Sequence, residues 1–362
     1  MRAIAALMVI ALHASEKFHA LFPAMPMEGV IKETVARFDF GRAGVVLFFA
    51  ISGFVIPSSL RPGDAISKFP TRRFFRLYPA YWLSIVTGIV AVYWLWGEAP
   101  PLKTILLNLT MLQRFLGGED VLGLYWTLQI ELMFYAICAL LWVSGLIERT
   151  RLLAAVSLCA AAYWYFSLAS GLGLYGWFLP VRPGFDGYHL EWFAYLSIMF
   201  MGASCRRHVG GDMRGLWITG LTVFIWLAAQ PLTGIYLYWK NIAPEFVAMK
   251  YGAYAIGLWA FFILAFVVRI RHPVMVWLGR ISYSLYLQHP IAIALTAWLL
   301  MRSGSQHFST VGICMCVATL ATIVLAALSY KFIEAPSIAL SDRLTRTLAI
   351  WPAKAPERAA EA

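Results

Sequence analysis

Apolar runs of about 20 residues recur from one end of the 362-residue chain to the other, and each can cross a hydrocarbon layer about 30 Å thick. Hydrophobic residues make up 61% of the sequence and charged residues only 13%, whereas a soluble domain has roughly 25% charged residues. A single core surrounded by water cannot bury that much apolar surface. The sequence therefore predicts an all-α integral membrane protein whose main solvent is the lipid bilayer.

The lengths of the apolar runs predict a bundle of about ten transmembrane helices. The expected spans cover residues 3–22, 42–60, 78–97, 124–145, 151–170, 190–205, 213–231, 250–268, 281–301 and 311–333. The stretch 102–116 is too short and too polar to cross, and we expect it to form an interfacial or re-entrant helix. Residues 1–340 are expected to form one membrane domain, and residues 341–362, rich in Ala, Pro and charge, a disordered cytoplasmic tail.

The basic residues indicate how the chain is oriented in a membrane and do not indicate nucleic-acid binding. The formal net charge is +11, but Lys and Arg lie in short loops between the apolar runs. With the N-terminus in the cytoplasm, most of the 29 Lys and Arg residues fall on the cytoplasmic side, as the positive-inside rule requires. An even number of spans then places the C-terminus in the cytoplasm too, in a multi-pass protein of the inner (plasma) membrane. All five cysteines lie within apolar segments, which predicts neither a disulfide framework nor a metal site.

Ionisable side chains inside spans are costly to insert and are therefore candidates for function. Arg2 and His13 are eleven residues apart, which brings them within about 20° of one helix face and separates them by about 16 Å. This spacing suits an anionic donor anchored at Arg2 with its reactive end near His13, although an interhelical hydrogen bond would also explain His13. Glu131 lies at comparable depth on an oppositely directed span, so it is expected to pair with His13 or, alternatively, with a loop arginine.

Three arginines, Arg72, Arg73 and Arg76, cluster at the cytoplasmic start of the third expected span. Arg73 and Arg76 are three residues apart and share a helix face, and guanidinium groups bind phosphates well. Anchoring by the positive-inside rule also explains this cluster. Both interpretations stay open at this point.

Two further polar positions fall in the last two expected spans. His289 lies mid-span beside Pro290, which frees a backbone carbonyl for another donor. Glu334 lies at the cytoplasmic end of the last span. A structural role explains either residue as well as a direct catalytic one.

Six motifs with polar residues follow one another along nearly the whole chain. They are RAIAALMVIALHA with Arg2 and His13, GVVLFFAISGFVI with Ser52, Gly53 and Phe54, RRFFRLYPAYW with Arg73 and Arg76, YWTLQIELMFY with Trp126 and Glu131, ISYSLYLQHP from Ser282 to Pro290, and YKFIEAP with Glu334, Ala335 and Pro336. In type and order they resemble the motifs of the acyltransferase 3 family of integral membrane acyltransferases.

This resemblance implies ten spans, acyl-coenzyme A (usually acetyl-CoA) as a cytoplasmic co-substrate, no bound cofactor, and a carbohydrate or glycolipid acceptor such as lipopolysaccharide, exopolysaccharide, peptidoglycan or a lipo-oligosaccharide. It makes His13 the catalytic candidate, as a general base or as the group that accepts the acyl chain. Glu131, the second catalytic candidate, is expected to set the tautomer and basicity of His13. It implies donor binding by the arginines Arg2, Arg72, Arg73 and Arg76, and supporting roles for Ser52, Tyr283, His289 and Glu334.

One position departs from the family pattern. The second-span motif commonly carries an acid between its Gly-Val pair and Leu-Phe-Phe, where this chain has Val46. If that acid orients the histidine, Asp39 or Glu131 is expected to replace it here. A different class of protein also stays open, namely a transporter in which Glu131, His13 and His289 form a proton relay.

Overall fold

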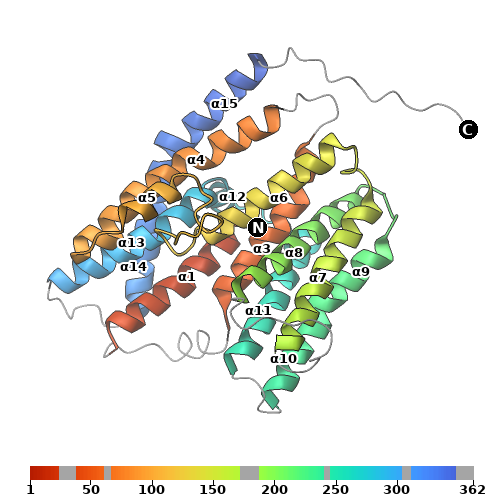
Figure 1. Ribbon diagram of the computed structural model, residues 1–362. Helices are drawn as coiled ribbons and strands as arrows, with labels where there is room; N and C mark the ends of the chain where they lie inside the picture. The colour runs from red at the N-terminus through yellow and green to blue at the C-terminus, as the bar shows by residue number, and fades with distance from the viewer. Residues whose placement is uncertain (24–37, 61–66, 172–186, 240–244, 304–310, 348–362) are drawn as a thin grey trace, which may run out of the picture.

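The computed structural model describes residues 1–23, 38–60, 67–171, 187–239, 245–303 and 311–347, and every regular element in these ranges is helical. The α-helices are α1 (Arg2–Leu21), α3 (Phe40–Val55), α4 (Lys68–Gly88), α5 (Leu102–Asn108), α6 (Trp126–Val143), α7 (Thr150–Gly171), α8 (Gly187–Val209), α9 (Leu216–Phe224), α10 (Gln230–Trp239), α11 (Glu245–Phe262), α12 (Pro273–Arg280), α13 (Ser282–Ser303), α14 (Val311–Ser329) and α15 (Ala335–Thr347) (Figure 1). Short π-helical turns extend α4, α11 and α14 and join α9 to α10. The all-α prediction is confirmed for the described residues.

Seven helical segments of the described chain are long and apolar enough to cross a membrane, which makes this a multi-pass membrane protein. They are Arg2–Leu21, Phe40–Ser59, Lys68–Trp96, Trp126–Val143, Leu216–Tyr236, Ser282–Arg302 and Val311–Arg346. Two shorter apolar helices, Thr150–Phe166 and Tyr251–Val267, and the helix α8 occupy the other three predicted ranges. Each predicted span thus coincides with a helix, while the count of ten crossings and the orientation of the termini stay predictions.

The segments 102–116 and 341–362, which were not expected to cross the membrane, are each helical in part. Only Leu102–Asn108 of the stretch 102–116 is α-helical, and Leu102 and Leu106 on this short helix are exposed. Helix α15 continues to Thr347, so the first residues of the segment predicted to be a disordered tail are helical instead. The reason is packing, because α15 lies against α4. Residues 348–362 lie outside the described part of the chain.

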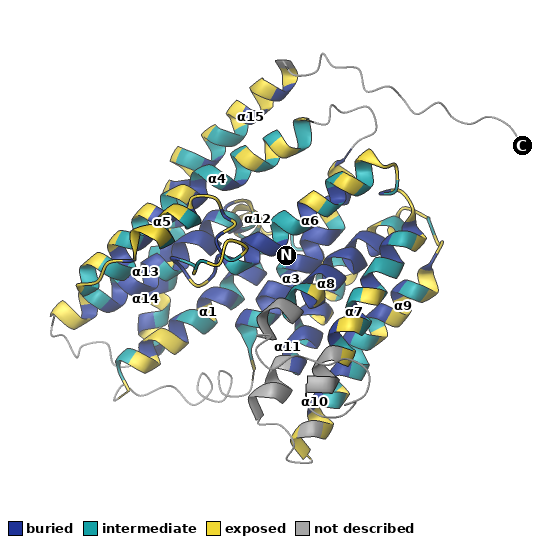
Figure 2. Cartoon of the chain, viewed as in Figure 1, coloured by how far each residue is buried: buried dark blue, intermediate teal, exposed yellow. Residues whose placement is uncertain are grey.

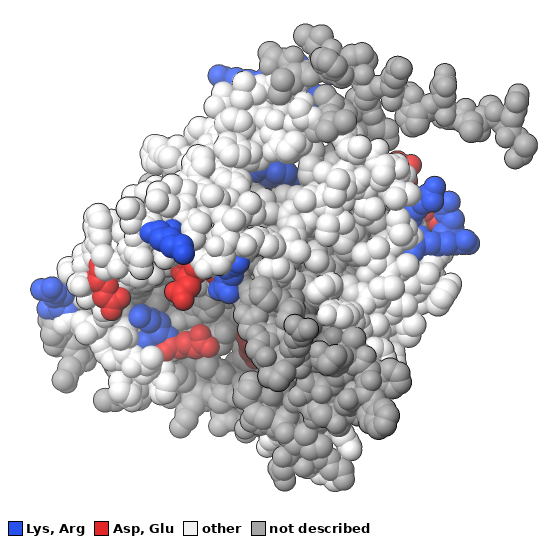
Figure 3. Space-filling model, viewed as in Figure 1, with Lys and Arg blue, Asp and Glu red and all other residues white. Residues whose placement is uncertain are grey.

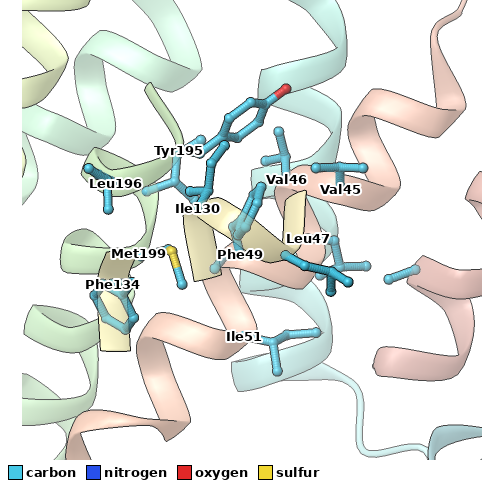
Figure 4. Close-up of a cluster of buried hydrophobic side chains, with 14 of the residues drawn as sticks. Val45, Val46, Leu47, Phe49, Ile51, Ile130, Phe134, Tyr195, Leu196 and Met199 are labelled. Carbon is cyan, nitrogen blue, oxygen red and sulfur yellow. The ribbon is translucent and has the colours of Figure 1, made fainter. Parts of the chain in front are cut away.

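Helix α3 lies at the centre of the bundle, between α1 on one side and α8 and α11 on the other (Figure 1). Its side chains are largely buried, as are those of α13, whereas the outer helices expose apolar side chains as lipid-facing helices do (Figure 2). Figure 4 shows Phe49 of α3 beside Ile130 of α6 and Met199 of α8, all in one buried apolar cluster. Charged residues on the face seen in Figure 3 form a few groups, and the rest of its described surface is uncharged.

Glycine permits the closest helix contact in this core. A Cβ atom at Gly53 of α3 would lie 1.9 Å from the carbonyl oxygen of Met199 in α8, and one at Gly202 of α8 would lie 2.5 Å from the carbonyl oxygen of Ala50. Helices in lipid associate through such close backbone packing, since lipid gives them no hydrophobic drive to pair. The two glycines therefore fix the distance between α3 and α8.

Replacing Gly53 by alanine should lower the thermal unfolding midpoint in detergent by several degrees. The added methyl group meets backbone atoms that cannot rotate away, and overpacking of this kind costs about 1–3 kcal/mol. Gly220→Ala in α9 is the matched control, because a Cβ there meets nothing within 4 Å. Equal midpoints for the two variants would contradict the packing argument.

The departure at Val46 also has a packing explanation. Val46 is fully buried, and a Cβ atom at Gly257 of α11 would lie 2.7 Å from the Cβ atom of Val46. An acidic side chain at this position would face an apolar helix contact without a partner. Valine fills the contact, so whatever orients His13 must come from elsewhere.

One ion pair outside the spans closes the turn between α8 and α9. Asp212 accepts hydrogen bonds from the Arg214 guanidinium and from the Thr150 hydroxyl at the start of α7. These bonds hold the pKa of the Asp212 carboxyl well below its ordinary value. The turn is thereby tied to α7, next to the helices that pack on α3.

Candidate functional site

A cavity opens among α1, α3, α4, α6 and α13 and gathers most of the predicted site residues. Its lining includes six of them, namely Arg2, Ser52, Arg73, Arg76, Glu131 and Tyr283. The rest of the lining consists of Val45, Phe48, Phe49, Leu77, Thr127, Leu128, Tyr135, Ser282 and Tyr286. Segments from five separate motifs, up to about 280 residues apart in the chain, thus meet around one space.

Two of the guanidinium groups in this cavity, those of Arg2 and Arg76, have no bonded partner in the part of the chain that the structure describes. Among the described residues, neither Arg2 nor Arg76 makes a hydrogen bond or an ion pair within 4 Å, although both are half-buried. Arg2 lies close enough to Arg76 and to Glu131 for their charges to interact. Partly buried cations without a bonded partner favour an anionic ligand, and guanidinium donors suit phosphate oxygens.

Arg73 is held in place by its neighbours. Its Nη2 donates to Ser59 Oγ at 2.9 Å, and its guanidinium lies over the rings of Phe69 and Tyr135, 5.1 Å and 4.9 Å from their centroids. Arg73 also lines two other cavities, one beside α15 and one between α4 and α6. It therefore stands at the junction of three spaces on one side of the protein.

Glu131 lines the first cavity, called here the arginine-lined cavity, and is not bonded to His13. The Tyr135 hydroxyl donates to Glu131 Oε1 at 2.5 Å and the Ser52 hydroxyl donates to the same oxygen at 3.5 Å. The pairing of Glu131 with His13 that their depth suggested is therefore wrong. Tyr135 was not predicted, although its position four residues after Glu131 on one helix is the spacing at which side chains meet.

His13 instead pairs with His289. His13 Nδ1 and His289 Nε2 are 3.0 Å apart, and the ring centroids are 5.1 Å apart. His289 is fully buried and His13 is half-buried. Neither ring lines the arginine-lined cavity, but Tyr286 does, and its ring packs against His289 with centroids 5.7 Å apart. One tyrosine ring thus borders both the cavity and the histidine pair.

Two predicted supporting residues join helices around the cavity. The Tyr283 hydroxyl donates to the backbone carbonyl of Leu77 at 2.9 Å and so links α13 to α4. Ser284 donates to Glu334 Oε2 at 2.6 Å, and both side chains are buried. The Glu334 carboxylate interacts with the charges of Arg76 and Arg2. Glu334 and Glu131 therefore both offset part of the positive charge of the arginines.

Arg72 lies outside the first cavity and lines the second. This second cavity lies among α4, α6 and α15 and is also lined by Lys68, Arg73, Arg76 and Trp142. Arg72 Nε is 3.9 Å from Asp342 Oδ1 of α15, and both side chains are about half exposed. Because Arg73 and Arg76 border both spaces, the two cavities form adjoining parts of one basic region.

Asp39, the other expected substitute for the missing acid, caps a helix. It accepts from the backbone N–H of Arg42 at 2.8 Å and from Arg42 Nε at 3.1 Å, at the start of α3. Arg42 also donates to Glu191 and to the Tyr195 hydroxyl, each at 3.0 Å. Asp39 lies near enough to His13 for their charges to interact, but its oxygens are bonded to Arg42.

Comparison with known proteins gives one family match over most of the chain. A family model described as "Acyltransferase domain" matches residues 1–328. Helix α15, which lines the second cavity, lies beyond this match. No solved structure matches the chain.

Three relatives resemble the chain to different extents. Nodulation protein 10 of Rhizobium leguminosarum bv. viciae is 25% identical over 84% of this chain and 84% of its own length. Acetyltransferase ORF330 of Acidianus two-tailed virus is 24% identical over 69% of this chain and 72% of its own length. The exopolysaccharide production protein ExoZ of Rhizobium meliloti (strain 1021) is 35% identical over 30% of this chain and 36% of its own length.

Proposed function

The chain belongs to the acyltransferase 3 family, as an enzyme of the O-acyltransferase type, and we propose that it moves an acyl group from acyl-coenzyme A to a hydroxyl of a cell-surface carbohydrate or glycolipid. The observation that carries this proposal is the cavity in which Arg2 and Arg76 make no hydrogen bond or ion pair with any other described residue. It adjoins a tyrosine that packs on the buried histidine pair. The Tyr286 ring thus has the arginines that can bind phosphate on one side and the histidine pair, which can supply a base, on the other.

The donor binds across the two adjoining cavities. Arg2 and Arg76 hold its pyrophosphate. The nucleotide end of the donor lies in the second cavity, which Arg72 and Lys68 line. Trp142 in that cavity offers a ring on which a base can stack. The acylated arm then points past Ser52 and Tyr283 toward Tyr286. These contacts position the thioester and make no bond to the reacting carbon.

His13 acts as general base on the acceptor hydroxyl. Acetyl is the acyl group, in keeping with the relative named acetyltransferase, and the name of the exopolysaccharide production protein supports a carbohydrate acceptor. Ten spans place Arg2 and the C-terminal segment 341–362 at the cytoplasmic face of the inner membrane. Acyl-CoA serves as co-substrate and no metal takes part.

Incubating the purified protein with labelled acetyl-CoA and surface glycans should release coenzyme A thiol only when a glycan is present, with the label retained on the glycan. Mass spectrometry of surface glycans from cells with and without the gene should show a mass difference equal to one or more acyl groups. Proton-coupled solute movement by the reconstituted protein, without thiol release, would instead support a transporter.

Replacing Glu131 by glutamine should lower the thermal midpoint of the unliganded protein by a few degrees, because three cavity arginines lose a compensating charge. Adding coenzyme A should then raise the midpoint by more than in the parent, since phosphate replaces the lost charge. Glu148→Gln, an exposed loop carboxylate, is the control. A shift in the pH optimum with an unchanged response to coenzyme A would contradict this role and support Glu131 as a partner of His13.

A further inference from the structure

Pro290 in α13 leaves one backbone carbonyl, next to the histidine pair, without its usual helical donor. In an α-helix the carbonyl of residue 286 accepts from the N–H of residue 290, but Pro290 has no N–H to give. The carbonyl oxygen of Tyr286 is therefore open to another donor. His289 Nδ1 lies 2.6 Å from it. Two acceptors at that distance would repel each other, so His289 Nδ1 carries the proton and donates to Tyr286.

This bond determines the other nitrogen of His289. The ring is fully buried and lies beside a second imidazole, so a charge on it would be costly and the ring is neutral. With its proton on Nδ1, its Nε2 has only a lone pair. His13 Nδ1, 3.0 Å away, must then supply the proton of the hydrogen bond between them.

We propose that His289 is a positioning residue that fixes the tautomer of His13, so that His13 Nε2 is the unprotonated nitrogen that accepts the proton of the acceptor hydroxyl. The inference rests on the proposed function for its chemical consequence, but its geometry stands on the chain from Pro290 through Tyr286 and His289 to His13. It also supplies the orienting group that Val46 does not provide.

The proton balance of the transfer follows directly. The acceptor hydroxyl gives its proton to His13 Nε2 while its oxygen forms a bond to the thioester carbonyl carbon. The carbon–sulfur bond then breaks, and the thiolate of coenzyme A takes the proton from Nε2. Throughout, His13 Nδ1–H donates to His289 Nε2, and this bond strengthens while His13 carries positive charge. Such a bond favours the transition state over the ground state.

Two substitutions at His289 separate positioning from packing. Glutamine offers a carbonyl oxygen that can accept from His13 Nδ1–H, whereas methionine has similar bulk without a strong acceptor. His289→Met should lower kcat about 100-fold, as expected for a misdirected base, with an unchanged KM for acetyl-CoA. His289→Gln should recover at least about 10-fold of that loss. Equal kcat values for the two variants, or full activity in His289→Met, would overturn the proposal.

A measurement without turnover separates this inference from the proposed function. Nitrogen-15 spectra of histidine-labelled protein in bilayers should show His13 protonated at Nδ1, with the signal assigned by its loss in His13→Gln. The signal should move toward the Nε2-protonated form in His289→Met. His13 protonated at Nε2 in the parent protein would overturn the proposed role of His289 even if acyl transfer is observed. If the tautomers are as expected but no acyl transfer can be measured, the role of His289 stands and the proposed function is refuted.

Discussion

Replacing His13 by alanine should lower acyl transfer at least about 100-fold, because a positioned general base contributes roughly 10²–10⁴-fold. The protein should still fold and insert, since the change removes a polar group from α1 and leaves the small-residue contacts of that helix in place. The KM for acetyl-CoA should stay within a factor of about three, because His13 does not line the arginine-lined cavity.

The matched control is His19→Ala. His19 is on the same helix, six residues further along, and is exposed at its last turn. The His19→Ala variant should transfer the acyl group at the parental rate, measured as label on the glycan under saturating donor. Transfer by His13→Ala within about tenfold of the parent would remove His13 from the chemistry.

The helices could be predicted from the sequence because apolar length fixes them one at a time. Each of the predicted ranges coincides with a helix, since a backbone in lipid must satisfy its own hydrogen bonds. The motifs also identified the residues that meet in the cavity, although they lie on five different helices. What apolar length cannot give is the neighbour of each helix, which depends on packing between helices such as that at Gly53 and Gly202.

The wrong partner for His13 has this origin. Counting residues along each expected span puts His13 and Glu131 at comparable depth, but Glu131 lies in the cavity beside Arg2, which is about 16 Å along the helix from His13. Helix α1 packs against α3, α13 and α14, whereas α6 packs against α8, so the histidine meets His289 of α13. The effect of Pro290 was predictable, because a missing N–H frees a defined carbonyl whatever surrounds it.

Replacing Arg76 by glutamine should raise the KM for acetyl-CoA roughly 10- to 100-fold, the equivalent of a lost hydrogen bond to a charged group. Arg76 borders both cavities and has no hydrogen bond or ion pair among the described residues, so its removal breaks no hydrogen bond there, and Arg2 still offsets the charge of Glu334. Saturating donor should therefore restore kcat to within about threefold of the parent. Arg73→Gln is a less clean test, because Arg73 also binds Ser59 and two aromatic rings.

The alternative explanation of Arg76 is that it only anchors the chain by the positive-inside rule, and Arg206→Gln separates the two. Arg206 is exposed at the end of α8 over the Phe54 ring, at the end of α3 that carries Ser52, and it lines none of the three cavities described above. It loses the same charge as Arg76 on the side expected to be cytoplasmic. If anchoring is the whole role, both variants should lose membrane-inserted protein equally and keep the parental KM. If Arg76 holds the donor, only its variant should need more acetyl-CoA, and coenzyme A should protect it less against thermal unfolding than it protects Arg206→Gln.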